Sequence, residues 1–189
     1  MRPVIGCLGA GRMGRGIAVV FAFAGHQVVV VDFKKREASA FDALAVEAKA
    51  EIRSTLDILS RIDLLPAELV PTIADRIAIV SRQEAAAALP RCDVIFEGMP
   101  EILSLKQAAL AEASRLAGDG PIIASTTSTI LVDDLAGSIE HPGRFLNAHW
   151  LNPAYLVPLI ELSPGRLTAP EVTVRMKALL EGIGKVPVV

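Results

Sequence analysis

Apolar positions along the chain alternate between two patterns, short uninterrupted runs and longer stretches with an apolar residue every three or four positions. The short runs predict strands buried on both faces, and the longer stretches predict helices. The expected strands cover residues 4–8, 28–31, 77–80, 93–96, 121–124, 144–149, 157–162 and 186–189. The expected helices cover residues 11–24, 83–89, 101–116, 132–136 and 170–181, with a helical pair at about 35–75. Strands separated by helices predict an α/β fold with a doubly wound, mostly parallel sheet.

The helical pair is longer than a connection between two parallel strands needs. A single apolar stripe runs along its first part, and Leu65-Pro66 then ends that helix before a second, shorter one begins. The stripe consists of Phe41, Ala45, Ala48, Ile52, Leu56 and Leu59. We expect a helix-turn-helix insertion at about 35–75 that projects from the sheet, within one domain covering residues 1–189.

Composition and charge exclude several classes of protein. Hydrophobic residues make up 52% and charged residues 21% of the 189 residues, which is typical of a folded globular chain and not of a disordered one. The formal net charge of −2 leaves no basic excess for binding nucleic acid. No apolar run reaches the roughly 18–20 residues of a membrane span, so we expect a cytoplasmic protein. Cys7 and Cys92 lack metal-ligand spacing and are expected to be buried free thiols, and no metal is expected.

Residues 9–14 read Gly-Ala-Gly-Arg-Met-Gly, between the first expected strand and the first expected helix. In this position Gly9 allows a tight turn, Gly11 leaves room for a pyrophosphate, and Gly14 lets helix and strand pack closely. Backbone N–H groups at the helix start would then bind the phosphates. Arg12 and Met13 belong to the same loop and are counted with the expected cofactor-binding residues, although Met13 also suits helix packing.

Asp32 follows the next strand, where its carboxylate can accept hydrogen bonds from the adenosine ribose. A carboxylate there repels a 2′-phosphate, so the pattern favours NAD over NADP and a Rossmann-type fold. Lys34, Lys35 and Arg36 come next, and in a first helical turn they would oppose the helix dipole. They are either a solvated surface or a site for a phosphate of NADP or coenzyme A.

Three polar groups follow later strands, where ligands of open α/β sheets bind: Glu97-Gly98, residues 125–129 and His149. If the runs at 144–149 and 157–162 form an antiparallel pair centred near Tyr155, Glu161 lies opposite His149. A carboxylate in this apolar run is costly unless it is paired, and a His–carboxylate pair suits a general base. A purely structural ion pair is the alternative. His26 and His141 have no evident partner and are expected to be solvated.

The sequence resembles the NAD-binding domain of the L-3-hydroxyacyl-CoA dehydrogenase family along its whole length. The resemblance is carried by the loop from Gly9, Val30-Val31-Asp32, Pro100-Glu101 with Lys106, residues 125–129, and the segment from His149 to Glu161. It implies NAD as cofactor and an oxidoreductase of fatty acid metabolism. It also implies that His149 takes the proton of the substrate 3-hydroxyl, Glu161 orients His149, and Ser128 hydrogen-bonds the reacting oxygen. Asn152, Glu101 and Lys106 are implied to lie along the nicotinamide and its ribose.

Two departures from the family pattern leave the substrate open. Thr126 replaces a usual Asn, and Val157-Pro158 replaces a usual Met-Lys pair. The segment from Asn152 to Glu161, which contains the second departure, more closely resembles relatives that act on free hydroxy acids, such as L-gulonate 3-dehydrogenase (the lambda-crystallin type) and carnitine dehydrogenase. Basic residues of the helical insertion would favour coenzyme A, unless they are solvated surface: Lys49, Arg53 and Arg61. A non-catalytic NAD-binding or structural protein is a further alternative, but it would need no base such as His149.

The resemblance also implies a helical dimerisation domain after the NAD-binding domain, and we expect that domain to be absent from this chain. The chain ends at Val189 within an apolar strand pattern, so we expect a fragment of a homodimeric protein. The fragment is expected to bind NAD but to turn substrate over poorly or not at all.

Overall fold

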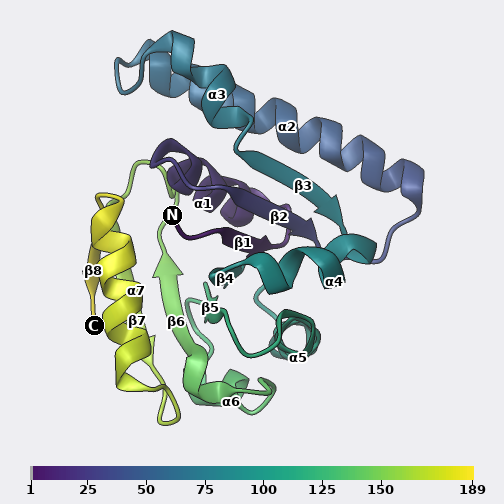
Figure 1. The fold of residues 1–189 in the computed structure, drawn as a ribbon, viewed down its shortest axis with the longest axis vertical. Helices are drawn as coiled ribbons and strands as arrows, with labels where there is room; N and C mark the ends of the chain where they lie inside the picture. The colour runs from purple at the N-terminus through teal and green to yellow at the C-terminus, as the bar shows by residue number, and fades with distance from the viewer. Residues whose placement is uncertain (1) are drawn as a thin grey trace.

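The computed structural model describes residues 2–189, which form one eight-stranded sheet flanked by helices (Figure 1). The strands are β1 Ile5–Leu8, β2 Val28–Asp32, β3 Ile77–Ser81, β4 Val94–Glu97, β5 Ile122–Ser125, β6 Phe145–Trp150, β7 Leu159–Pro164 and β8 Val186–Val188. Their order is β3-β2-β1-β4-β5-β6-β7-β8. β1 to β6 are parallel, β7 is antiparallel to β6, and β8 is parallel to β7. The expected mostly parallel sheet with antiparallel C-terminal strands is confirmed.

The α-helices are α1 Arg12–Phe23, α2 Ala38–Arg61, α3 Val70–Ala74, α4 Ala85–Ala88, α5 Leu103–Ala117, α6 Val132–Ala136 and α7 Pro170–Gly182. Short 3-10 turns adjoin α3 at Ala67–Leu69 and α4 at Arg82–Glu84 and Leu89–Arg91, and a further one precedes β6 at Pro142–Arg144. The expected start of α5 at Glu101 is wrong, because Ile102 is extended and leaves Glu101 in the preceding loop. No helix within residues 2–189 is long and apolar enough to span a bilayer.

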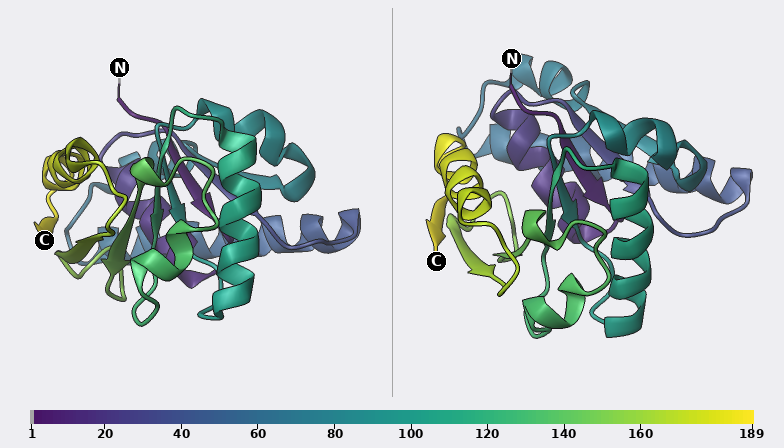
Figure 2. Two further views of the ribbon diagram at one scale, coloured as in Figure 1. Left: turned by 90° about the horizontal axis from the view of Figure 1, so that it is seen from below. Right: turned by 60° about the horizontal axis from the view of Figure 1, so that its bottom comes forward.

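Helices cover both faces of the sheet (Figure 2). Successive residues of a strand point to opposite faces, so each central strand contributes to two separate cores. In β4, Val94 and Phe96 belong to the core shared with α1, α2, α3 and α7. Ile95 between them belongs to the core shared with α4, α5 and α6. This double burial explains why the strands read as uninterrupted apolar runs.

The α2–α3 pair covers residues 38–74, and α2 reaches beyond the sheet at its N-terminal end (Figure 1). Only the last four of the six residues in its stripe are fully buried, from Ala48 onward. The expected position of the three cations in a first helical turn is wrong. Glu37 is extended and α2 begins at Ala38, so residues 34–36 lie in the loop after β2.

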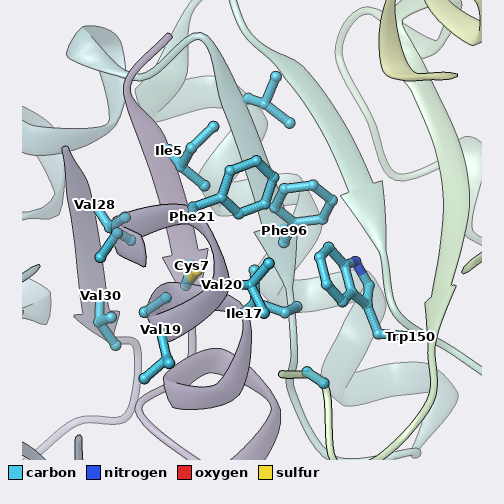
Figure 3. Packing of buried hydrophobic residues seen from close by; sticks show 14 of the residues in the cluster. Ile5, Cys7, Ile17, Val19, Val20, Phe21, Val28, Val30, Phe96 and Trp150 are labelled. Carbon is cyan, nitrogen blue, oxygen red and sulfur yellow. The ribbon is translucent and has the colours of Figure 1, made fainter. Parts of the chain in front are cut away.

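Three aromatic rings connect the core to the end of β6 (Figure 3). Phe21 of α1 lies between His26 and the rings of Phe96 and Trp150, with centroid distances of 5.4–6.0 Å. His26 is not solvated as expected, because it is 5% exposed and its Nδ1 lies 2.8 Å from the carbonyl oxygen of Pro3. Trp150 directly follows His149 and is 2% exposed, so its packing fixes the backbone at the end of β6.

The two cysteines are buried free thiols, as expected. Burial raises the pKa of Cys7 far above its usual range and raises that of Cys92 to about 11. Both thiols therefore stay protonated and unreactive near neutral pH.

Candidate active site

The glycine loop joins β1 to α1 with the geometry that the sequence predicts. Gly9 has a φ of 100°, and a Cβ on Gly14 would lie 2.0 Å from the carbonyl oxygen of Gly9. A Cβ on Gly11 would meet nothing within 4 Å, so open space lies beside the helix start. No side chain caps α1, which leaves its first N–H groups for an anion. Arg12 is exposed, whereas Met13 is half-buried and packs against the core.

Asp32 ends β2 beside this loop and is 4% exposed. It lines a hollow of about 380 Å³ together with Gly9, Gly11 and Lys34. The position of this hollow, between the glycine loop and a carboxylate on the next strand, fits the pyrophosphate and adenosine ribose of a dinucleotide. The Nε of Arg36 lies 2.5 Å from the Oδ2 of Asp32, a pairing that the sequence did not predict.

Glu101 organises the loop that follows β5. Its Oε1 accepts hydrogen bonds from the hydroxyl of Thr127, from the N–H of Ser128 at 3.0 Å, and from both the N–H and the hydroxyl of Thr129. Burial raises the pKa of Glu101, but these hydrogen bonds and the nearby Lys106 ammonium outweigh it and lower the pKa to about 2. Ser128 itself is exposed, with its backbone held by Glu101.

We expect Glu101→Gln to destabilise the protein more at pH 6 than at pH 3. The folded-state pKa lies below its usual value near 4.5, so the carboxylate stabilises the fold fully above that value and less as the pH falls toward 2. The measurement is the difference in Tm between wild type and variant at the two pH values. Glu140→Gln at an exposed position serves as control and should show no such trend. An equal Tm difference at both pH values would contradict the assigned hydrogen bonds.

A buried ion pair lies beneath Glu101. Glu97, at the end of β4, is 0% exposed and Lys106 of α5 is 1% exposed. The Nζ of Lys106 lies 3.0 and 3.1 Å from the two oxygens of Glu97 and 3.4 Å from Glu101. Glu97 also accepts from the hydroxyl of Ser125 at 2.6 Å and from the N–H of Met99 at 2.6 Å. The sequence pattern indicates Glu97 as a polar group at a strand end but was not used to predict its pairing with Lys106. An acidic residue at a strand end, followed by a lysine within an amphipathic helix, can indicate such a pair.

His149 and Glu161 face each other across β6 and β7, in the register that the sequence predicts. The Nδ1 of His149 lies 2.7 Å from the Oε2 of Glu161. Nδ1 is therefore the protonated nitrogen, and Nε2 is left to accept a proton. Glu161 is not buried, although it lies within an apolar run of the sequence. Its side chain is 56% exposed.

The loop between β6 and β7 carries Asn152, which is exposed. Lys185, just before β8, donates hydrogen bonds to the carbonyl oxygens of Ala154 at 2.6 Å and Val157 at 2.8 Å. Lys185 is 8% exposed, and burial lowers its pKa. Sequence reasoning missed this residue, because nothing near Lys185 in the chain indicates that it holds a loop some 30 residues earlier.

The carboxyl ends of adjacent strands bring these groups to one edge of the sheet. β5 and β6 are neighbours, and the side-chain amide of Asn147 donates to the carbonyl of Thr127 at 3.1 Å. This bond places the 126–129 loop beside the strand that carries His149. The edge thus combines an anion-binding helix start, an exposed serine and an oriented imidazole. Within residues 2–189 no three His, Cys, Asp or Glu side chains are grouped to hold a metal.

Comparison with known proteins identifies relatives of the whole chain. A family model described as 3-hydroxyacyl-CoA dehydrogenase, NAD binding domain, matches residues 4–189. The chain is 31% identical over 186 residues to 5-formyl-3-hydroxy-2-methylpyridine 4-carboxylate 5-dehydrogenase of Mesorhizobium japonicum, covering 98% of the chain and 56% of the relative. It is also 31% identical to the lambda-crystallin homolog of Bos taurus, over 97% of this chain and 55% of that relative.

Among solved structures, (S)-3-hydroxybutyryl-CoA dehydrogenase from Ralstonia eutropha superposes with a TM-score of 0.89 at 30% identity, over 100% of this chain and 63% of that one. The chain thus spans little more than half the length of each of these relatives.

Proposed function

The chain belongs to the 3-hydroxyacyl-CoA dehydrogenase family as its NAD-binding domain, and from this premise we propose the reaction that it serves. The reaction is hydride transfer between NAD and the 3-hydroxyl carbon of an L-3-hydroxyacyl-CoA. The observation that carries the proposal is the 2.7 Å contact between His149 and Glu161 beside the loop of Ser128. A protein that only binds a dinucleotide needs no imidazole oriented in this way.

In the proposed mechanism each polar group of the site has one task. Bound NAD supplies the hydride acceptor. The Nε2 of His149 takes the proton of the substrate hydroxyl, and the Glu161 carboxylate stabilises the imidazolium that forms. The hydroxyl of Ser128 hydrogen-bonds the reacting oxygen and so helps to orient the alcohol.

The proposed cofactor contacts follow the same edge of the sheet. Backbone N–H groups from Gly9 to Gly14 bind the pyrophosphate, and Asp32 binds the adenosine ribose. Arg12 and Met13 border the pyrophosphate, and Glu101 and Asn152 lie along the nicotinamide half. For Lys106 we propose an indirect role, because its ammonium is enclosed by Glu97 and Glu101 and almost nothing of it is exposed. It acts by positioning Glu101.

The alternative substrate is a free hydroxy acid such as L-gulonate or carnitine. It is supported by Val157-Pro158 and by the Mesorhizobium relative, whose name describes a pyridine carboxylate substrate. The coenzyme-A proposal is supported by the Ralstonia structure and by exposed cations along α2, Lys49, Arg53 and Arg61. We also propose that the whole protein is a cytoplasmic homodimer formed through a further helical domain.

The test is NADH oxidation by the whole gene product, with this 189-residue chain as control. We expect turnover with acetoacetyl-CoA, and much less with 3-dehydro-L-gulonate or dehydrocarnitine. The isolated chain should bind NADH with little turnover, because it spans little more than half the length of its relatives and we propose that the rest of the protein completes the substrate pocket. Turnover confined to the free acids would shift the assignment to the alternative, and robust activity of the isolated chain would refute the need for a second domain.

A further inference from the structure

Asp32 shares the hollow beside the glycine loop with Arg36, which lies in the loop before α2 and forms an ion pair with Asp32. The hollow is also lined by Arg15, Lys34 and Glu47. We propose that this end of the site accepts a 2′-phosphate as well as a 2′-hydroxyl, so that NADP(H) is a second cofactor, and that Arg36 is the residue which decides between the two. The inference rests on the dinucleotide site of the proposed function.

The ion pair removes the usual barrier to NADP. An unpaired carboxylate at the end of β2 repels a 2′-phosphate. Here the Nε of Arg36 lies 2.5 Å from Oδ2, so the pair carries no net charge. Asp32 has 5% of its side chain exposed and Arg36 has 29%, so the guanidinium forms the outer part of the pair. A phosphate that enters from solvent therefore meets the cation first.

The Asp32–Arg36 ion pair leaves hydrogen-bonding atoms that can bind either NAD or NADP. Nε of Arg36 and Oδ2 of Asp32 are used in their mutual contact. Oδ1 of Asp32 and the two terminal nitrogens of Arg36 make no hydrogen bond with any of residues 2–189. Oδ1 can accept from a ribose hydroxyl, and the terminal nitrogens can donate to a phosphate, for which a guanidinium has the right geometry.

Residues around the Asp32–Arg36 pair anchor its loop and add positive charge to the hollow. Arg82 donates from Nη1 to the carbonyl of Phe33 at 2.9 Å and lies over the Phe33 ring, which anchors the start of the loop. Lys34 is exposed and lines the same hollow. Arg15 is paired with Glu51 at 2.7 Å and Arg36 with Asp32, so Lys34 is the cation of this hollow that makes no ion pair within residues 2–189.

The experiment is a pair of titrations of this chain, with NADH and with NADPH, followed by nicotinamide fluorescence at fixed ionic strength. We expect the two Kd values to agree within about tenfold. Arg36→Gln should raise the Kd for NADPH by about tenfold or more, which is the scale of one charged hydrogen bond. The same variant should change the Kd for NADH by less than about threefold. Lys35→Gln makes the same charge change beside Arg36, but its side chain lines a different hollow, so it should leave both Kd values unchanged.

Three results are decisive against the inference. The inference is overturned if the wild-type chain binds NADPH more than about tenfold more weakly than NADH. It is also overturned if Arg36→Gln changes the Kd values for NADH and NADPH by the same factor. An equal loss of NADPH affinity in Lys35→Gln would show a diffuse charge effect and also overturn it. If NADH itself fails to bind, the proposed function fails with it, so the two failures are distinguishable.

Discussion

Replacing His149 with asparagine in the whole gene product is expected to lower kcat by roughly 100-fold or more, which is the scale of a lost general base. The asparagine cannot take a proton at the position that Nε2 occupies. The glycine loop and Asp32 belong to other strands, so we expect the Kd for NADH to stay within about twofold of wild type. Stopped-flow turnover and NADH titration of the same preparation measure the two effects separately.

His141→Asn is the matched control for this variant. His141 is exposed and has no assigned role, so its replacement should leave both turnover and NADH affinity unchanged. Glu161→Gln should lower kcat less than His149→Asn, because it removes the stabilisation of the imidazolium and keeps the base. A His149→Asn protein that retains its rate would refute the catalytic assignment, whichever substrate the protein uses.

Lys106→Met is expected to lower the free energy of unfolding by about 3–5 kcal/mol, the cost of leaving one partner of a buried ion pair alone. Glu97 is fully buried and would keep only the neutral hydrogen bonds from Ser125 and Met99. Hydrophobic replacement keeps most of the volume of the lysine side chain, so the loss reports the charge and not a cavity. Urea unfolding followed by circular dichroism measures it.

The control is Lys177→Met, which removes a lysine from an exposed pair 3.9 Å from Glu181. Such a surface pair contributes little, so the expected change is below about 0.5 kcal/mol. The double variant Glu97→Leu/Lys106→Met removes both charges and should recover part of the loss. If Lys106→Met cost no more than Lys177→Met, the buried pair would not stabilise the fold as assigned.

Local patterns in the sequence determined the strands, the glycine loop and the His149–Glu161 pair. Strands buried on both faces appear as apolar runs, and a loop that must approach a phosphate needs glycine at set positions. The facing of His149 and Glu161 could be predicted because an antiparallel pair has a side-chain period of two, so counting outward from Tyr155 sets the register. These features depend on residues close together in the chain.

The tertiary structure decided which partner each charged group has. Glu97 and Lys106, Arg36 and Asp32, and Lys185 and the loop after β6 each meet through the packing of separate elements or the path of a loop. The tertiary structure also decided which side chains are exposed to solvent. Glu161, for example, lies in an apolar run and yet faces solvent. Long side chains have several reachable partners, and only the folded backbone selects one. The sequence therefore determined the position of the chemistry, and the fold determined the charges that surround it.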